Sequence, residues 1–330
     1  MEERTALSAL STPYGRLCVS AFSERNCKNE YTFFETLCIN TAAKAIEIAK
    51  VDAAASDVLF VLASTKGNIA CLGNSDIALP LSARRIARYF GNTNEPIVVS
   101  NACISGLNAI IVATRLLLAD RFATAIVIGA DVLSNFVVSG FSSLKAVSDK
   151  PCRPFDRDRE GLNLGEAAAT MVLQQGQSGW QVLIGSMHND ANHISGPSRT
   201  GEGAFRCLQD VLNVVPKSEI ALVGTHGTAT RYNDEMETQA LRRADLLSVP
   251  VMALKGYYGH TLGAAGVLET ILAMLSVDRQ RLIGCRGYEN VGTTSSLNIS
   301  AENRTICGTA FLKMLSGFGG CNAAIAMRKC

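Results

Sequence analysis

Residues 96–130 read PIVVSNACISGLNAIIVATRLLLADRFATAIVIGA, and this stretch determines the fold class that the sequence predicts. Two unbroken apolar runs, Pro96–Ser100 and Ala125–Ala130, are typical of strands that are covered on both faces of a sheet. Between them, Gly106–Leu118 has the length and composition of a mostly apolar helix. A strand, a helix and a second strand in this order predict a crossover unit in a parallel sheet.

The same alternation continues on both sides of this unit. Upstream, Val58–Leu62 (VLFVL) has the composition of another buried strand. Downstream, the patterns predict helices at 204–214, 234–244 and 262–275, strands at 220–223 and 249–254, and two strands joined by a Gly-rich turn within 308–328. Two successive sets predict an α/β fold with a duplicated unit, divided near Gly176–Gly179. No Pro-rich linker separates the halves, 1–176 and 177–330, so we expect them to pack as one body.

The composition excludes several classes of function. The 330-residue chain is 48% hydrophobic and 18% charged, and its 31 Lys and Arg against 29 Asp and Glu give no global argument for nucleic acid or a membrane surface. No segment approaches the roughly 18 consecutive apolar residues of a membrane span, and the charged N-terminus does not resemble a signal peptide. The eleven cysteines include no CxxC pair and no zinc-like spacing with histidine. We therefore expect reduced thiols, no metal, no cofactor and a cytoplasmic location.

One cysteine lies where the first crossover strand is expected to end and its helix to begin. The segment Ser100–Gly106 (SNACISG) places Cys103 at this junction, and we expect Gly106 to permit the sharp turn. A helix N-terminus favours the thiolate, and the N–H of the cysteine can point toward an oxyanion. Taken alone, the position suits an inert core cysteine better than a nucleophile.

Two of the four histidines follow predicted strands in matching contexts. His226 lies in VGTHGTAT and His260 lies in KGYYGHTLGAAG, each on a glycine-bearing loop directly after a strand. Loops at strand ends commonly hold catalytic groups, so two such histidines and a candidate nucleophile indicate one site. A further segment, Ser316–Asn322 (SGFGGCN), has glycines on both sides of Phe318 that let the backbone approach a ligand closely, although an ordinary hairpin turn fits the segment alone.

Four motifs, NACISG, GTHGTAT followed by DEME, KGYYGHTLGAAG and GFGGCNA, together resemble the β-ketoacyl-(acyl-carrier-protein) synthases of the thiolase superfamily, in their elongating Cys-His-His class. The segments Pro154–Gly161, Leu164–Ala168 and Asn189–His193 also fit this family, and the match runs in order from about residue 58 to the C-terminus. The resemblance implies a thiolase-like fold with αβαβα layers and two duplicated halves.

The resemblance also implies an acyltransferase that extends an acyl chain in fatty acid, polyene or polyketide synthesis. Cys103 would take the acyl chain from a carrier-protein thioester, and the N–H groups of Cys103 and Phe318 would form the oxyanion hole. His226 and His260 would bind the malonyl thioester carbonyl and favour loss of carbon dioxide. The resulting enolate would attack the Cys103 thioester in a Claisen condensation.

Further residues match positions with known roles in the family. Lys255 and Glu269 would form a charged pair beneath the histidines, Thr228 and Thr230 would line the pantetheine channel, and the Phe318 ring would act as a gate. Four residues look structural instead, fixing loops and caps: Asp156, Arg157, Asp234 and Glu237. The implied partners are acyl carrier protein and a second subunit in a homo- or heterodimer.

The chain departs from the family pattern in its N-terminal part. About 100 residues precede Cys103, and the segment GRLCVSAF is a weak strand candidate, so we expect the first strand and the cap of the N-terminal half to be shortened or absent. Arg231 replaces a common proline, and Asn101 and Ile104 flank the nucleophile where smaller or hydroxyl residues are usual. The acyl length is therefore not readable.

Three alternatives remain open on these residues. Arg84, Arg85 and Arg88 on a predicted helix form a candidate docking surface for the acidic carrier protein, although a solvated helix face explains them equally well. A non-catalytic chain-length-factor-like partner subunit would share the fold but typically loses the nucleophile. A thiolase would replace one histidine by a second catalytic cysteine; Cys321 is close to that position, but it follows GFGG and His260 is retained.

Overall fold

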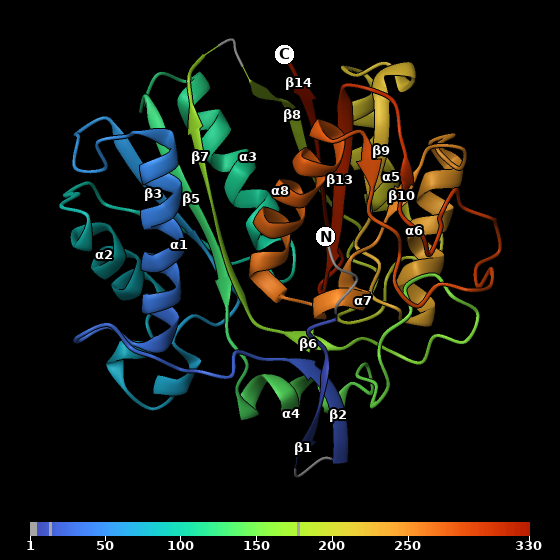
Figure 1. Ribbon diagram of the computed structural model, residues 1–330, viewed down its shortest axis with the longest axis horizontal. Coiled ribbons are helices and arrows are strands. Elements are labelled where there is room, and N and C mark those ends of the chain that lie inside the picture. The colour runs from blue at the N-terminus through green and yellow to red at the C-terminus, as the bar shows by residue number, and fades with distance from the viewer. Residues whose placement is uncertain (1–4, 13–14, 177–178) are drawn as a thin grey trace.

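The computed structural model describes residues 5–12, 15–176 and 179–330, arranged in five layers (Figure 1). Helices α1 (Phe33–Ala49) and α2 (Leu79–Tyr89) cover the outer face of the N-terminal sheet. Helices α3 (Ser105–Leu118) and α8 (Ala265–Asp278) form the middle layer between the two sheets. Beyond the C-terminal sheet lie α5 (Glu202–Leu212) and α6 (Arg231–Arg243). This is the αβαβα order that the resemblance predicts.

The two sheets share one topology, but the N-terminal sheet has one strand fewer. It has the order β4-β3-β5-β7, with β7 antiparallel to its neighbour β5. The C-terminal sheet has the order β10-β9-β13-β14-β8, with β14 antiparallel to both neighbours. The strands are β3 (Val58–Ala63), β4 (Ile97–Val99), β5 (Thr124–Asp131), β7 (Ala167–Gln174), β8 (Trp180–Asn189), β9 (Ile220–Gly224), β10 (Val251–Met252), β13 (Ala310–Gly317) and β14 (Cys321–Lys329). Within the described residues, no strand of the N-terminal sheet corresponds to β8, which confirms the expected lack of a first strand there.

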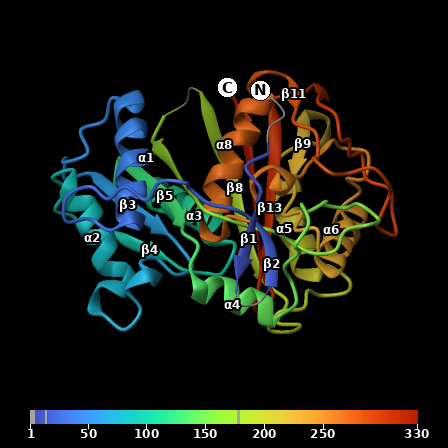
Figure 2. The ribbon, with the colours of Figure 1, turned by 60° about the horizontal axis from the view of Figure 1, so that its bottom comes forward.

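The N-terminal segment forms a separate small sheet instead. Strand β2 (Gly15–Ser20) contains most of the weak strand candidate, and it pairs with β1 (Ser8–Thr12) and in parallel with β6 (Leu164–Gly165). This sheet lies beside α4 (Asn135–Ser143), and Leu17 and Val19 of β2 pack in one cluster with residues of that helix (Figure 2). The remaining elements are short: α7 (Lys255–Tyr258), β11 (Arg281–Leu282), β12 (Arg304–Thr305), and 3-10 helices at Ile69–Cys71, Ser75–Ile77, Lys217–Glu219 and Leu262–Ala264.

Helices α3 and α8 cross at glycines, and this crossing lies directly behind the strand ends of both halves. A Cβ on Gly266 would lie 2.1 Å from the Leu107 nitrogen, and one on Gly106 would lie 2.6 Å from the Gly263 carbonyl oxygen. Gly106 therefore serves close helix packing, so its predicted role in the turn is wrong. The turn is made by Ala102, whose φ of 45° is unusual for a residue with a side chain.

Three findings bear on further expectations from the sequence. No helix in the described part of the chain is long and apolar enough to cross a membrane. The predicted division near Gly176–Gly179 includes residues 177 and 178, which lie outside the described residues. All eleven cysteines carry free thiols, and seven of these side chains are buried in the core or the site: Cys18, Cys38, Cys103, Cys152, Cys207, Cys285 and Cys321.

Candidate active site

A cavity of about 510 Å³ opens between the two halves, at the ends of strands from both sheets. Cys103 follows β4, His226 follows β9, and His260 follows β10 and α7. All three line the cavity, as do Thr228, Thr230 and Phe318. The residues that the sequence predicts for the site are thus brought together from segments far apart in the chain.

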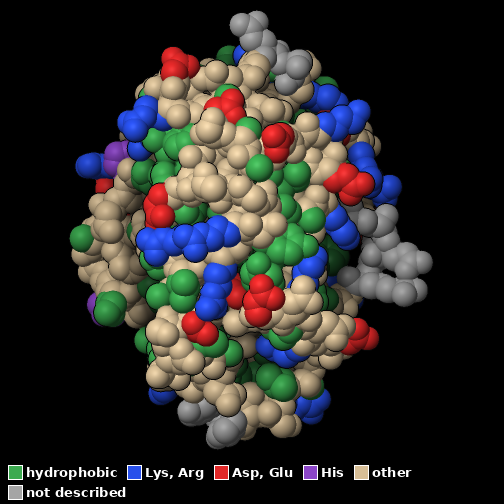
Figure 3. Space-filling model, turned by 90° about the vertical axis from the view of Figure 1, so that its left-hand side faces the viewer, with side chains coloured by type: hydrophobic (Ala, Val, Ile, Leu, Met, Phe, Trp, Pro, Cys, Tyr) green, Lys and Arg blue, Asp and Glu red, His purple; other side chains and the backbone are tan. Residues whose placement is uncertain are grey.

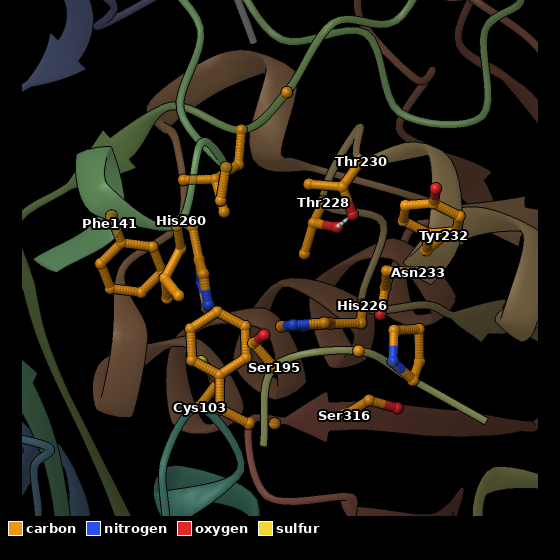
Figure 4. A pocket seen from close by; sticks show the side chains of 18 of the residues that line it. Cys103, Phe141, Ser195, His226, Thr228, Thr230, Tyr232, Asn233, His260 and Ser316 are labelled. Carbon is orange, nitrogen blue, oxygen red and sulfur yellow. Dashed lines mark hydrogen bonds between the residues drawn. The ribbon is translucent and has the colours of Figure 1, made fainter. Parts of the chain in front are cut away.

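Cys103, His226 and His260 converge at the floor of this cavity (Figure 4). The thiol sulfur and one nitrogen of each imidazole all lie within 4.8 Å of one another. The two rings meet edge to face, with centroids 4.9 Å apart. Each of the three side chains is buried, so their polar atoms face one another and the cavity rather than bulk water.

The nucleophile turn is fixed by its own hydrogen bonds. The Ser105 hydroxyl donates to the Ala102 carbonyl (2.6 Å) and accepts from the Asn101 N–H (2.8 Å). The GFGG loop packs on this turn, since a Cβ on Gly317 would lie 3.2 Å from the Cys103 nitrogen. The next residue, Phe318, stacks its ring on that of Phe141 in α4, with centroids 5.6 Å apart.

Burial acts on the Cys103 thiol against the expectation from the helix N-terminus. Desolvation, with a smaller contribution from the nearby Cys321, raises the pKa of Cys103 to about 12, and the Lys255 charge offsets only part of this. The sequence predicts a favoured thiolate because the position next to α3 is visible in the pattern, whereas the depth of burial is not. The resting nucleophile is a neutral thiol.

The rate of alkylation measures the thiolate fraction of Cys103 directly. With a pKa of about 12, only about 10⁻⁴ of Cys103 is thiolate at pH 8, so its rate of reaction with iodoacetamide is expected to rise about tenfold per pH unit from pH 7 to 10. The Cys103→Ala variant provides the background from the other ten cysteines. A plateau reached below pH 9 would mean that the helix N-terminus outweighs burial.

Hydrogen bonds to the backbone define the orientation of His260. The backbone N–H of His260 donates to the Asn163 carbonyl (2.6 Å), and the ring Nδ1 accepts from the Leu262 N–H (3.3 Å). This places the ring proton on Nε2, which is buried without a protein partner among the described residues and points toward the centre of the site (Figure 4). In this tautomer Nε2 is a hydrogen-bond donor and does not offer a lone pair to a metal.

Both imidazoles are held in their neutral form. Burial, followed by the Lys255 and Lys313 charges, lowers the pKa of His260 well below its usual value. The same three influences, with His260 itself, lower the pKa of His226 well below its usual value. Neutral imidazoles with an available N–H suit the stabilisation of negative charge that develops on a bound oxygen.

A buried charge cluster lies beneath the histidines. Lys255 Nζ lies 2.7 Å from Glu269 Oε1, which is the predicted pairing. Lys313 Nζ lies 2.6 Å from the other oxygen of Glu269, and the sequence analysis missed this residue. The sequence feature that marks Lys313 is its position within the apolar run AFLKML of β13. A strand covered on both faces leaves the lysine ammonium group no route to solvent.

Three of the four residues predicted to be structural do fix loops around the site. Glu237 accepts hydrogen bonds from the N–H groups of His226 (2.6 Å) and Gly227 (2.7 Å). Asp234 accepts from Phe155 and Thr228, and Asp156 accepts from Glu289 and Asn290. The Arg157 side chain differs, because it is 64% exposed and its one ionic contact within the described part of the chain is with the neighbouring Asp158.

The predicted channel residues line one side of the cavity. The hydroxyls of Thr228 and Thr230 lie 2.9 Å apart and form a hydrogen bond (Figure 4). They face the same space as the thiol and the imidazoles. A ligand with amide groups would find hydroxyl partners along this wall and a buried thiol at its end.

Comparison with known proteins agrees with this geometry. The model of the β-ketoacyl synthase N-terminal domain matches residues 29–178, and that of the β-ketoacyl synthase C-terminal domain matches residues 181–289. A tetracenomycin polyketide synthase ketoacyl synthase alpha subunit from Streptomyces glaucescens is 30% identical over 77% of this chain and 65% of its own length. A 3-oxoacyl-[acyl-carrier-protein] synthase 2 from Rhizobium meliloti is 31% identical over 70% of this chain and 60% of its own. The chain thus spans less than two thirds of these relatives.

Solved structures share the fold along the whole chain. A β-ketoacyl synthase from Burkholderia phymatum STM815 has a TM-score of 0.90 at 22% identity, covering 99% of this chain and 93% of its own. A chain from a ketosynthase in complex with its chain length factor, from Xenorhabdus doucetiae, has a TM-score of 0.87 at 23% identity over 99% and 90%. The two domain models together match most of the sequence, and the Cys-His-His cluster lies where their halves meet. The chain therefore belongs to the β-ketoacyl synthase family.

Proposed function

We propose that the chain catalyses the decarboxylative condensation of an acyl thioester with malonyl-acyl carrier protein, in fatty acid, polyene or polyketide synthesis. The observation that carries this proposal is the convergence of Cys103, His226 and His260 within 4.8 Å at the floor of one cavity. A thiol and two neutral imidazoles are the groups that acyl transfer and enolate stabilisation require.

In the first step, the Cys103 sulfur attacks the acyl thioester carbonyl. The N–H groups of Cys103 and Phe318 bind the oxyanion, and the packing of Gly317 on the Cys103 nitrogen supports this role for the loop. The carbon–sulfur bond to the carrier breaks, and the proton of the Cys103 thiol passes to the departing pantetheine sulfur. The acyl chain is then held on Cys103.

In the second step, malonyl thioester enters along Thr228 and Thr230, and its carbonyl oxygen accepts hydrogen bonds from His226 and His260. The bond to the carboxylate breaks, carbon dioxide leaves, and the electron pair forms the enolate. The enolate carbon attacks the Cys103 thioester, and the released Cys103 sulfur takes up one proton. Each imidazole donor contributes about 2.7–4 kcal/mol by analogy with other oxyanion donors. The Phe318 ring, stacked on Phe141, acts as the gate between the two steps.

Carrier-protein docking is proposed at the cavity mouth, where Lys145 and Arg231 are exposed. The arginines of α2 offer less free charge than the sequence suggests, because Arg84 binds Glu95 (2.7 Å) and Arg85 binds Asp76 (3.1 Å). Figure 3 shows the side of the molecule on which α1 and α2 lie, and basic and acidic side chains are interspersed on this face.

We also propose a dimer, a cytoplasmic location and a functional division into residues 1–176 and 177–330. The free thiols support a reducing compartment. The family resemblance supports pairing with a second copy or with a related partner subunit.

The test of the proposed function is direct. Incubation with an acyl-carrier-protein thioester is expected to leave one acyl group on Cys103, seen by mass spectrometry of the intact protein and its peptides. Malonyl-carrier protein is then expected to release carbon dioxide and yield the β-ketoacyl product. Absence of both the adduct and carbon dioxide release would favour the non-catalytic partner subunit instead.

A further inference from the structure

Lys313 is a fully buried lysine in the middle of β13 that the proposed steps do not use. Its ammonium group contacts Glu269 Oε2 at 2.6 Å and donates to the carbonyls of Thr225 (2.7 Å), Gly224 (3.2 Å) and Met314 (3.1 Å). A lysine without exposure is rare unless it is paired, and here all of its partners belong to the site or to the strand beneath it.

The carbonyls that Lys313 contacts lead directly into the histidine loop. Lys313 holds the carbonyls of Gly224 and Thr225, and Lys255 holds the next one, that of His226. On the other side of this backbone, Glu237 accepts from the N–H groups of His226 and Gly227. The peptide that carries His226 is thus fixed between two ammonium groups and one carboxylate.

The cluster also brings two positive charges close to the imidazoles. Lys255 and Lys313 each bind a different oxygen of the single carboxylate of Glu269, so two cations share one anion beneath the imidazoles. Further ionisable groups close to this cluster are Glu237 and Asp234 of α6, the buried hydroxyl of Tyr258 of α7 near Glu269, and the Cys103 thiol. Lys255 and Glu269 alone would form a neutral pair, and Lys313 adds a second positive charge to this pair.

We propose that Lys313 is a positioning residue of this site, which holds the backbone before His226 and keeps both imidazoles neutral through its charge. The proposal deepens the proposed function, because a protonated imidazole would give the malonyl carboxylate a counter-ion and oppose its loss as carbon dioxide. A buried positive charge near an imidazole disfavours a second positive charge on the ring, and this effect needs no contact between the two groups.

The test compares the wild type with Lys313→Met and Lys313→Gln. Met has similar length and no charge, whereas Gln can still donate a hydrogen bond toward Thr225. NMR of labelled histidine rings follows protonation directly, and the chain has only four histidines. We expect His226 and His260 to titrate at higher pH in both variants than in the wild type, with His188 and His193, which lie outside the cluster, as internal references.

The second readout is carbon dioxide release from malonyl thioester between pH 6 and 8. The ratio of wild-type to variant rate is expected to rise as the pH falls, because a higher histidine pKa in the variant reduces its neutral imidazole fraction before that of the wild type. A Lys313→Arg variant retains the charge and is expected to keep the wild-type pH profile. If His226 and His260 each titrate at the same pH in the wild type and in the Met and Gln variants, the proposal is overturned and Lys313 is a structural residue. A shifted titration without any carbon dioxide release would instead contradict the proposed function and leave the role of Lys313 standing.

Discussion

Replacement of Cys103 by Ala is expected to abolish condensation while leaving decarboxylation of malonyl thioester measurable. Without the sulfur no acyl group can be held, and loss of a catalytic nucleophile lowers a rate by about 10³-fold or more. The positions of His226 and His260 do not depend on the thiol. Glu237 binds the backbone N–H of His226, and the Asn163 carbonyl binds the backbone N–H of His260. Condensation is followed by product mass spectrometry, and decarboxylation by release of labelled carbon dioxide.

The matched control removes a donor instead of the nucleophile. In the Cys103→Ala background, His260→Ala is expected to lower carbon dioxide release by about 10²–10³-fold, the usual effect of one oxyanion donor. The His260→Ala single variant should still form the acyl adduct on Cys103 in the presence of acyl-carrier protein. Loss of carbon dioxide release in Cys103→Ala to the level of the double variant would contradict the separation of roles between thiol and imidazoles.

The layers and the principal site residues could be predicted from the sequence for a physical reason. Strands covered on both faces are unbroken apolar runs, and loops at strand ends commonly hold catalytic groups, so Cys103, His226 and His260 could be assigned to one site. The structure confirms the predicted strands at β3, β4, β5 and β9 and the helices α3, α5, α6 and α8, with ends shifted by a few residues.

What the sequence could not show depends on depth and on distant contacts. The role of Gly106 depends on contacts with Gly263 of the 3-10 helix Leu262–Ala264 and with Gly266 of α8, whereas the local pattern alone suggested a role in the turn. The pKa of Cys103 depends on how fully the GFGG loop and its neighbours exclude water, which no spacing encodes. Lys313 lies between apolar neighbours in its strand, and its partner Glu269 is 44 residues earlier in the chain, so no local pattern connects the two.

The same cluster gives the largest expected effect on stability. Replacing Glu269 by Gln keeps the shape of the side chain but leaves Lys255 and Lys313 without their shared carboxylate. Removing one partner of a buried ion pair typically costs about 3–5 kcal/mol, because an uncompensated charge remains in the interior. The free energy of unfolding from urea titration at pH 7 is therefore expected to fall by about this amount.

The pH dependence of that loss separates charge from packing. Burial lowers the pKa of Lys313 in the folded protein, and Glu269 opposes this lowering, so the Gln variant should lower it further. A lysine whose pKa is depressed by folding binds fewer protons in the native state than in the unfolded chain, so stability rises as the pH increases toward the unfolded pKa. The deficit of Glu269→Gln is thus expected to shrink between pH 7 and 9.5, and adding Lys313→Met to it should restore part of the stability at pH 7. A deficit that is independent of pH and unchanged by Lys313→Met would show that Glu269 acts through packing alone, and the shared charge cluster would then contribute nothing to folding.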